Sequence, residues 1–213
     1  MKTILCYGDS NTWGFDPETQ ERYPGDTRWP GVLRAELGRD FTVVEEGLNG
    51  RTTVWDDPIE DHMSGAQYLL PCLQTHKPID LVIIMLGTND LKYRFHVSAF
   101  DIAESAGRLG DIVCASKTGP SASAPKVLIA CPAPILEAGP FAEAFRGGAE
   151  TSRRLHAEFG RMGRERGVPV FFVDEVAASS PVDGIHLAPS AHTAIGRAMA
   201  KEVRSILEKK ITR

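Results

Sequence analysis

Five short apolar runs, separated by longer amphipathic segments, constrain the fold of this sequence more than any other feature. The runs are predicted strands and cover residues 3–7, 41–45, 81–86, 127–131 and 168–173. The predicted helices cover residues 30–37, 65–75, 99–116, 146–166 and 190–209. The third run is apolar at every position, which is typical of a central parallel strand covered by helices on both faces.

This alternation predicts an α/β protein, a three-layer α/β/α sandwich around a mostly parallel sheet. The chain has 213 residues, enough for one sizeable core, so we expect a single domain over residues 1–213. Right-handed crossovers place the carboxyl ends of all the strands along one edge of the sheet. Because ligands of open α/β sheets bind beyond that edge, the residues that follow each strand are the candidate functional residues.

Two details of the helices can be predicted from local chemistry. Ser190 precedes an apolar helical stripe, and its hydroxyl is a plausible N-cap for the last helix. The fourth helix has an arginine-rich stretch, interleaved with Glu158 and Glu165, which we interpret as a solvated face. The arginines are Arg153, Arg154, Arg161, Arg164 and Arg166.

The charge of the chain gives no reason to expect a nucleic-acid or membrane partner. The formal net charge is -4, and both of those partners reward clustered lysine and arginine. No apolar stretch approaches the length of a membrane span, and the first residues lack the apolar core of a signal peptide. Four scattered cysteines show no metal-ligand spacing, which favours a reduced, cytoplasmic protein. They are Cys6, Cys72, Cys114 and Cys131.

Two connections, residues 11–29 and 132–145, are longer than a bare sandwich needs and contain many aromatic, proline and glycine residues. Long loops in compact domains tend to be functional, so these segments are candidates for the wall of a binding pocket. A subunit interface or simple loop packing explains them equally well.

Residues with reactive or hydrogen-bonding side chains follow the predicted strands at several points. The first strand is followed by Gly8-Asp9-Ser10, the second by a segment that contains Gly50, and the third by Gly87-Thr88-Asn89-Asp90. Asp183-Gly184-Ile185-His186 precedes the last helix. All four blocks are therefore expected to meet at one edge of the sheet.

These residue types match the needs of acyl transfer, which requires a nucleophile, a base, a group that orients the base and donors for an oxyanion. Ser10 is the candidate nucleophile, His186 the base and Asp183 the group that orients the histidine. The backbone N–H groups of Ser10 and Gly50 and the side-chain amide of Asn89 are the candidate oxyanion donors.

Each block has an ordinary structural explanation when it is considered alone. Gly-Asp-Ser is a common turn, Asn89 with Asp90 could cap a helix, and a lone histidine is often just partly buried. The functional hypothesis depends on their conjunction, because Gly-Asp-Ser and Gly-x-Asn-Asp should each arise by chance in under about a tenth of chains of this length.

The motif blocks resemble those of the SGNH or GDSL-type hydrolases, in the same order and over nearly the whole chain. The resemblance implies a flavodoxin-like sandwich with five parallel strands, no metal or other cofactor, and esterase or acyltransferase activity. It assigns to Ser10, Gly50, Asn89, Asp183 and His186 the roles given above. Asn11 stands where the family name has leucine.

Longer stretches look like the bacterial arylesterase/acyltransferase (perhydrolase) branch of that family, in which some members have alanine at the position of Gly50. The similar stretches are residues 4–14, 45–48, 51–53, 56–58 and 80–90. This closer resemblance implies a small ester substrate, acyl transfer to alcohols or hydrogen peroxide, and a homo-oligomer.

Trp13, Ile185 and Leu187 lie near the reactive residues in sequence and are the predicted walls of an apolar pocket.

Two other functions compete with the esterase hypothesis. One is a metal-dependent phosphoesterase that uses Asp9, Asp90 and His186, although their spacing is unlike that of metal ligands. The other is a non-catalytic carbohydrate- or partner-binding domain, because a fold alone does not prove activity.

Overall fold

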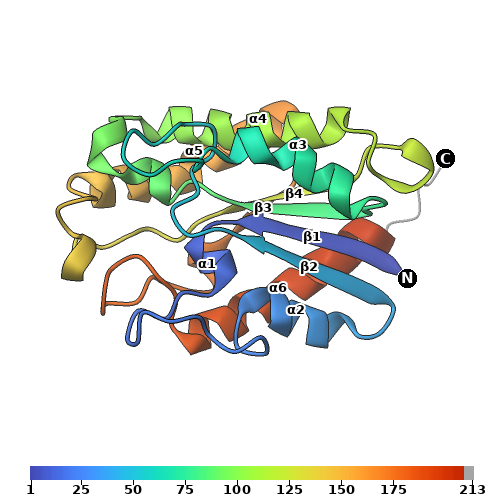
Figure 1. Cartoon of the computed structure of the whole chain (residues 1–213), viewed down its shortest axis with the longest axis horizontal. Coiled ribbons are helices and arrows are strands. Elements are labelled where there is room, and N and C mark those ends of the chain that lie inside the picture. The colour runs from blue at the N-terminus through green and yellow to red at the C-terminus, as the bar shows by residue number, and fades with distance from the viewer. Residues whose placement is uncertain (209–213) are drawn as a thin grey trace.

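A computed structural model describes residues 1–208 and contains one five-stranded sheet (Figure 1). Its strands are β1 (Lys2–Gly8), β2 (Phe41–Gly47), β3 (Leu81–Met85), β4 (Lys126–Cys131) and β5 (Val170–Phe172). All four pairings are parallel and the spatial order is β2-β1-β3-β4-β5. This order is that of flavodoxin-like sheets, so the predicted fold class is confirmed.

Helices cover both faces of the sheet, above and below it in Figure 1. One face carries α3 (Gly65–His76), α4 (Ala99–Ala115) and α5 (Gly148–Arg166). The other carries α2 (Trp29–Leu37) and α6 (Pro189–Glu208), while the short α1 (Ser10–Trp13) follows β1 directly. The connections also contain short 3-10 turns at Asn89–Leu91, Tyr93–Phe95, Pro120–Ala122, Gly139–Phe141 and Val173–Glu175.

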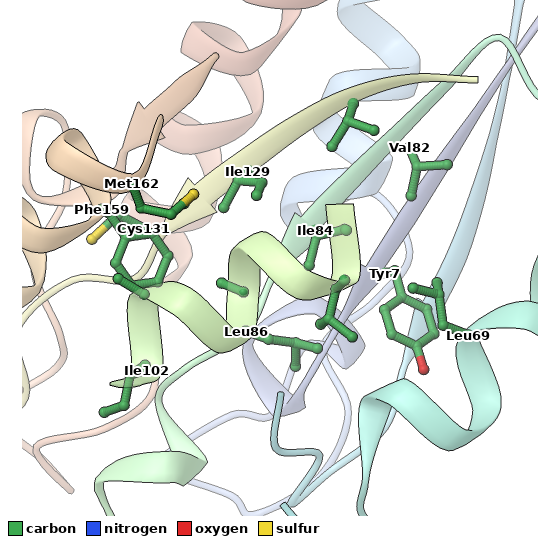
Figure 2. Close-up of a cluster of buried hydrophobic side chains, with 14 of the residues drawn as sticks. Tyr7, Leu69, Val82, Ile84, Leu86, Ile102, Ile129, Cys131, Phe159 and Met162 are labelled. Carbon is green, nitrogen blue, oxygen red and sulfur yellow. The ribbon is translucent and has the colours of Figure 1, made fainter. Parts of the chain in front are cut away.

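Alternate residues of the central strands supply the two cores, as the period of two in a strand requires. Tyr7, Val82 and Ile84 point toward α3 and α4 and belong to the core shown in Figure 2. Cys6 and Ile83, their neighbours along the strands, belong to the core beneath α2 and α6. Every residue of β3 is buried, as its uninterrupted apolar sequence predicts.

The start of the last helix differs from the prediction. Helix α6 begins at Pro189, so Ser190 lies inside the first turn and is not its N-cap. Proline suits this first position because its fixed φ is helical and its missing N–H has no partner to lose. The predicted end at residue 209 lies outside the described residues.

The arginine-rich face of α5 is exposed at four of its five arginines, as predicted, whereas Arg161 is half-buried and two of the arginines pair with another helix. Arg161 contacts Glu104 of α4 at 2.8 Å, and Arg166 contacts Glu104 at 2.7 Å and Asp111 at 2.6 Å. These pairs join α4 to α5, because the two helices pack side by side on the same face of the sheet (Figure 1). The charge pattern identified an exposed helix but could not identify a partner on another helix.

The register of the three central strands places the functional blocks together. Gly8, the last residue of β1, pairs with Gly47 of β2 and with Met85 of β3. The segments that follow these three residues therefore leave the sheet at the same edge and at the same level.

His192 of α6 is fully buried between α6 and α2, where its Nδ1 accepts a hydrogen bond from the Trp29 backbone N–H at 3.2 Å. Burial is the main cause that lowers the pKa of His192 to about 4, and the nearby side chains of His186 and Arg28 add to the shift. The folded protein thus keeps this ring neutral at pH values at which the unfolded chain protonates it, near pH 6.5.

We predict that protonation of His192 in the unfolded chain destabilises the protein progressively as the pH falls from 6.5 toward 4. The unfolded state binds the additional proton in this range, so the free energy of unfolding decreases with decreasing pH. The loss reaches about 3 kcal/mol for a pKa difference of this size. His192→Asn keeps an acceptor for Trp29 and removes the titration, so denaturant melts of the parent and this variant at several pH values isolate the effect.

His62→Asn, at an exposed histidine, is the control and should follow the parent curve. Parallel stability curves for the parent and His192→Asn would contradict the assignment.

Candidate active site

Ser10 begins α1 immediately beyond the end of β1. Asp9 caps this short helix, and its carboxylate accepts a hydrogen bond from the Asn11 backbone N–H at 2.9 Å. At Gly8, a Cβ atom would lie 2.0 Å from Thr12 Oγ1 and 2.9 Å from the Met85 carbonyl oxygen. A side chain at this position would collide with both groups, so only glycine allows α1 and β3 to approach the end of β1 this closely.

His186 and Asp183 lie on one turn ahead of α6. A single carboxylate oxygen of Asp183 accepts hydrogen bonds from the backbone N–H groups of Ile185 and His186, both at 2.9 Å. The turn is tied to neighbouring segments by backbone bonds from Ser180 N–H to the His186 carbonyl, at 2.7 Å, and from Leu136 N–H to the Gly184 carbonyl, at 2.8 Å. Short loops and dense hydrogen bonding therefore position the imidazole.

Three side chains form a continuous hydrogen-bonded series. The second carboxylate oxygen of Asp183 lies 2.5 Å from His186 Nδ1, and His186 Nε2 lies 2.9 Å from Ser10 Oγ. A proton on Nδ1, facing Asp183, leaves the Nε2 lone pair directed at the serine hydroxyl. Residues 176 positions apart in the chain are thereby brought into contact.

The carboxylate at the far end of this series stays ionised. Burial works against its charge, but hydrogen bonds from the His186 ring and from the backbone N–H groups of His186 and Ile185 outweigh burial. The pKa of Asp183 consequently lies below its usual value. A permanent negative charge at this point stabilises a positively charged imidazolium when His186 takes a proton.

Two phenylalanines enclose the imidazole. The ring centroid of Phe15 lies 4.2 Å from that of His186, and the ring centroid of Phe141 lies 5.7 Å from it. Phe15 belongs to the first long connection and Phe141 to the second, so both loops flagged in the sequence reach the same side chain. The length of these loops indicated either a pocket wall or a packing role, and no pattern in the sequence singled out these two rings.

The predicted oxyanion donors lie beside the same serine. Gly50, with a φ of +84° that favours glycine, and Asn89 both line the cavity onto which Ser10 and His186 open. Among residues 1–208, the backbone N–H groups of Ser10 and Gly50 have no protein acceptor. The Asn89 amide donates to the Arg51 carbonyl at 3.2 Å, which holds its side chain in place.

Asp90 holds the second and third strand ends together. Its buried carboxylate accepts hydrogen bonds from the backbone N–H and the hydroxyl of Thr53. Burial raises the pKa of Asp90 and that of Asp9 to about 6, although hydrogen bonds to each carboxylate oppose the shift. Both aspartates therefore support loops around the site rather than face its cavity.

The cavity beside Ser10 has a volume of about 260 Å³. One part of its wall is apolar, and the other is a charged rim in which Glu60 contacts Lys92 at 3.0 Å and Arg94 at 2.8 Å. The full lining comprises Ser10, Phe15, Asn49, Gly50, Glu60, Asn89, Lys92, Arg94, Phe141, Ala144, Phe145, Ile185 and His186. No pattern in the sequence predicted the charged rim, because Glu60 lies in one loop and Lys92 and Arg94 lie in another.

Only one of the three predicted pocket walls lines this cavity. Ile185 does, whereas Leu187 points into the core beneath α2 and α6. Trp13 also lies elsewhere, beneath the guanidinium of Arg22, which is 5.1 Å from its ring centroid. Ile185 and Leu187, two residues apart in one turn, face opposite directions. Proximity in sequence to the reactive residues therefore did not identify the residues that line the cavity.

The metal-dependent alternative gains no support from the arrangement of Asp9, Asp90 and His186. Within residues 1–208, these side chains do not form a group whose possible ligand atoms lie close together.

In the same part of the chain, no helix combines the length and apolarity needed to cross a membrane.

A serine, a histidine and an aspartate in hydrogen-bonded series, beside a small cavity, form the arrangement of hydrolases that attack acyl groups with a serine hydroxyl. The chain belongs to the GDSL-like lipase/acylhydrolase family, whose model matches residues 6–194. A comparison with curated proteins finds no match.

Solved structures of similar proteins agree with this family. An aryl esterase from M. smegmatis is 43% identical with a TM-score of 0.92, and the alignment covers 97% of this chain and 100% of that one. A carbohydrate acetylesterase from Sinorhizobium meliloti is 38% identical, with the same TM-score and the same coverage of both chains. The fold is shared by a G-D-S-L family protein from Veillonella parvula. This protein is 16% identical, with a TM-score of 0.64, and the alignment covers 96% of this chain and 99% of that one.

We predict that a fluorophosphonate labels Ser10 and no other serine of the chain, because His186 activates only this hydroxyl. Asp183→Asn should slow labelling by about 10⁴-fold, since the carboxylate fixes the histidine tautomer. Time-resolved mass spectrometry of the intact protein and of its peptides measures both effects. Labelling of a second serine at a comparable rate, or an unchanged rate in Asp183→Asn, would contradict the prediction.

Proposed function

We propose that the protein is a serine esterase that hydrolyses small acyl esters through an acyl-enzyme on Ser10. The observation that carries the proposal is the 2.9 Å contact between His186 Nε2 and Ser10 Oγ at the floor of a small cavity. Membership of the acylhydrolase family and the similarity to an aryl esterase support the same reaction class.

In the first half of the reaction, His186 removes the proton of Ser10 as the serine oxygen attacks the ester carbonyl. The resulting oxyanion accepts hydrogen bonds from the backbone N–H groups of Ser10 and Gly50 and from the Asn89 amide. Asp183 stabilises the imidazolium, which then gives its proton to the departing alcohol. One such oxyanion donor typically contributes about 2.7–4 kcal/mol to lowering the barrier.

In the second half, water enters the position that the alcohol has left. His186 takes one proton from this water as its oxygen attacks the acyl carbonyl, and the same donors hold the second oxyanion. Collapse of the intermediate breaks the bond to Ser10 Oγ, which recovers its proton from His186. The carboxylic acid leaves and the enzyme returns to its starting state.

The dimensions of the cavity support small substrates. Its volume of about 260 Å³ lies below the range of roughly 300–1,000 Å³ that is common for drug-sized ligands. Phe141, Phe145 and Ile185 occupy space that a longer acyl chain would need. We therefore favour short acyl groups on aryl or alkyl alcohols.

The enclosed imidazole supports a second outcome of the acyl-enzyme, namely transfer to an alcohol or to hydrogen peroxide. Ser10 and His186 are 5% and 6% exposed, and Phe15 covers one face of the ring. An acceptor that packs against these aromatic walls can then compete with water despite the higher concentration of water.

The alternative of a non-catalytic carbohydrate- or partner-binding domain has no specific observation in its favour. It would not require the ordered series of Asp183, His186 and Ser10.

Two further proposals rest on the sequence. One is that the protein forms a homo-oligomer, which light scattering would measure. The other is a cytoplasmic location, which cell fractionation would measure.

We predict that Ser10→Ala reduces the turnover of p-nitrophenyl acetate by a factor on the order of 10⁴–10⁶, because the covalent pathway is lost. Ser179→Ala is the matched control: Ser179 is also buried, but its hydroxyl donates to the Pro134 carbonyl away from the cavity. Initial rates and circular dichroism of the parent and both variants test the role. Near-parental turnover by Ser10→Ala would end the assignment.

Acyl transfer makes a separate prediction about product ratios. With p-nitrophenyl acetate and increasing concentrations of a simple primary alcohol, the new ester should form at the expense of acetate while nitrophenol release continues. Gas chromatography of the two acyl products gives the ratio. Acetate as the sole product at high alcohol concentration would refute transfer and leave the hydrolase proposal intact.

A further inference from the structure

Glu46, Cys72 and His76 lie together on the rigid part of the fold, behind the strand edge that carries the candidate active site. One possible ligand atom from each residue lies within 4.8 Å of the others, and within residues 1–208 no other group of histidine, cysteine and acidic residues is comparably close. Glu46 is on β2, and the other two residues are on α3.

The backbone explains why these three side chains meet. Cys72 and His76 are four residues apart on α3 and therefore share one face of the helix. Glu46 is the sixth residue of β2, whose neighbour Glu45 points to the opposite face of the sheet. Three residues from two regular elements thus converge without any contribution from a loop.

The two adjacent glutamates have different partners. The Glu45 carboxylate is neutralised by arginines, with Arg28 at 2.8 Å and Arg34 at 2.6 Å. The Glu46 carboxylate instead lies 2.7 Å from His76 Nε2 and beside the buried thiol of Cys72. Glu45 therefore serves as an ion-pair partner, whereas Glu46 completes a set of oxygen, nitrogen and sulfur donors.

We propose that Glu46, Cys72 and His76 form a binding site for a divalent transition metal ion such as Zn²⁺. Carboxylate, imidazole and thiolate are the ligands that Zn²⁺ takes in proteins, with solvent in the fourth position of a three-residue site. In a tetrahedral zinc site the ligand atoms lie about 3.3–3.6 Å apart. The nearest atoms of Glu46 and His76 lie 2.7 Å apart and would separate to reach that spacing, whereas Cys72 Sγ lies within 4.8 Å of both ligands and would move closer.

The electrostatic environment both supports and limits the site. Burial, together with the Glu46 carboxylate, raises the pKa of Cys72 to about 12, while Arg51 opposes the shift. A metal ion displaces the thiol proton to solvent, and the resulting thiolate and carboxylate charges balance a 2+ ion. Arg51 contacts the carbonyls of Gly8 and Glu46 and repels a cation, so the affinity is lower than in a site without a nearby guanidinium.

Solvent reaches Glu46 through a surface hollow and reaches His76 at the partly exposed end of its side chain. A cavity of about 520 Å³ opens over Glu46 and Arg51, and the His76 side chain is 26% exposed. The thiol lies beneath these groups, so an ion can enter at the carboxylate and the imidazole and then engage the sulfur.

Cobalt substitution tests the proposal directly, because Co²⁺ reports thiolate coordination through a near-ultraviolet charge-transfer band and four-coordination through intense visible bands. All proteins should carry Cys114→Ser, which removes the exposed thiol. On this background, one equivalent of Co²⁺ should give both signals, and Zn²⁺ should abolish them. Cys72→Ser should remove the charge-transfer band.

Competition with a chromophoric chelator measures the affinity for Zn²⁺. His76→Gln, at a half-buried position that tolerates a polar side chain, should weaken binding by at least about 10-fold. His156→Gln is the matched control: His156 also pairs with a carboxylate, Asp174 at 2.9 Å, but that pair is not part of a close group of ligands. Its affinity should equal that of the background protein.

Three results would overturn the proposal. They are the absence of a charge-transfer band in the background protein, its persistence in Cys72→Ser, and equal affinities of His76→Gln and His156→Gln. Cys131→Ser, which removes another buried thiol, should leave the band unchanged and separates loss of a ligand from loss of a buried sulfur.

Discussion

The parallel pairing of β1 with β2 on one side and β3 on the other is the constraint on which this molecule depends. It brings Gly8, Gly47 and Met85 to one level, so the three segments that continue from them emerge as neighbours. Both faces of β1 and β3 pack in buried apolar clusters, so a shift of one residue would move every side chain of a strand to the opposite face and disrupt its packing. The common position of Ser10, Gly50 and Asn89 at one edge of the sheet follows from this arrangement.

Hydrogen bonds between side chains and backbone then fix the positions of the functional residues along this edge of the sheet. Asp90 ties its own turn to Thr53, and Asn89 reaches the carbonyl of Arg51. On the other side, Asp183 organises its turn through two backbone N–H groups before it contacts His186. Asp90 therefore has a structural function, and Asp183 both organises its turn and interacts electrostatically with His186. These functions account for the aspartates around the site, because the proposed mechanism does not use a metal.

The sequence predicted the elements and the approximate positions of Ser10, His186 and Asp183 because each depends on local pattern and on chain topology. Strand periodicity identified the sheet, and parallel connections predicted that the ends of its strands would meet. The N-terminus of α6 was wrong by one residue because the serine signal outweighed Pro189, which immediately precedes it. The pairs from α5 to Glu104 could not be predicted, since they depend on how two helices lie against each other.

Side-chain direction accounts for the other differences. Ile185 and Leu187 are two residues apart in one turn, yet one lines the cavity and the other packs in the core. Phe15 and Phe141 cover His186 from loops that the sequence flagged only as long. The four-residue spacing of Cys72 and His76 was not recognised as a metal-ligand spacing, and their third companion comes from β2, which only the folded chain brings alongside.

The position of the two phenylalanines has a consequence for how such proteins diversify. Ser10, His186 and Asp183 are held by the sheet edge and by short, hydrogen-bonded turns, whereas the rings that enclose the imidazole are supplied by two long connections. Insertions and substitutions in those connections can reshape the entrance while the hydrogen-bonded series beneath it keeps its spacing. Selectivity and reactivity are therefore encoded in separate parts of the chain, and natural variation can alter one without disturbing the other.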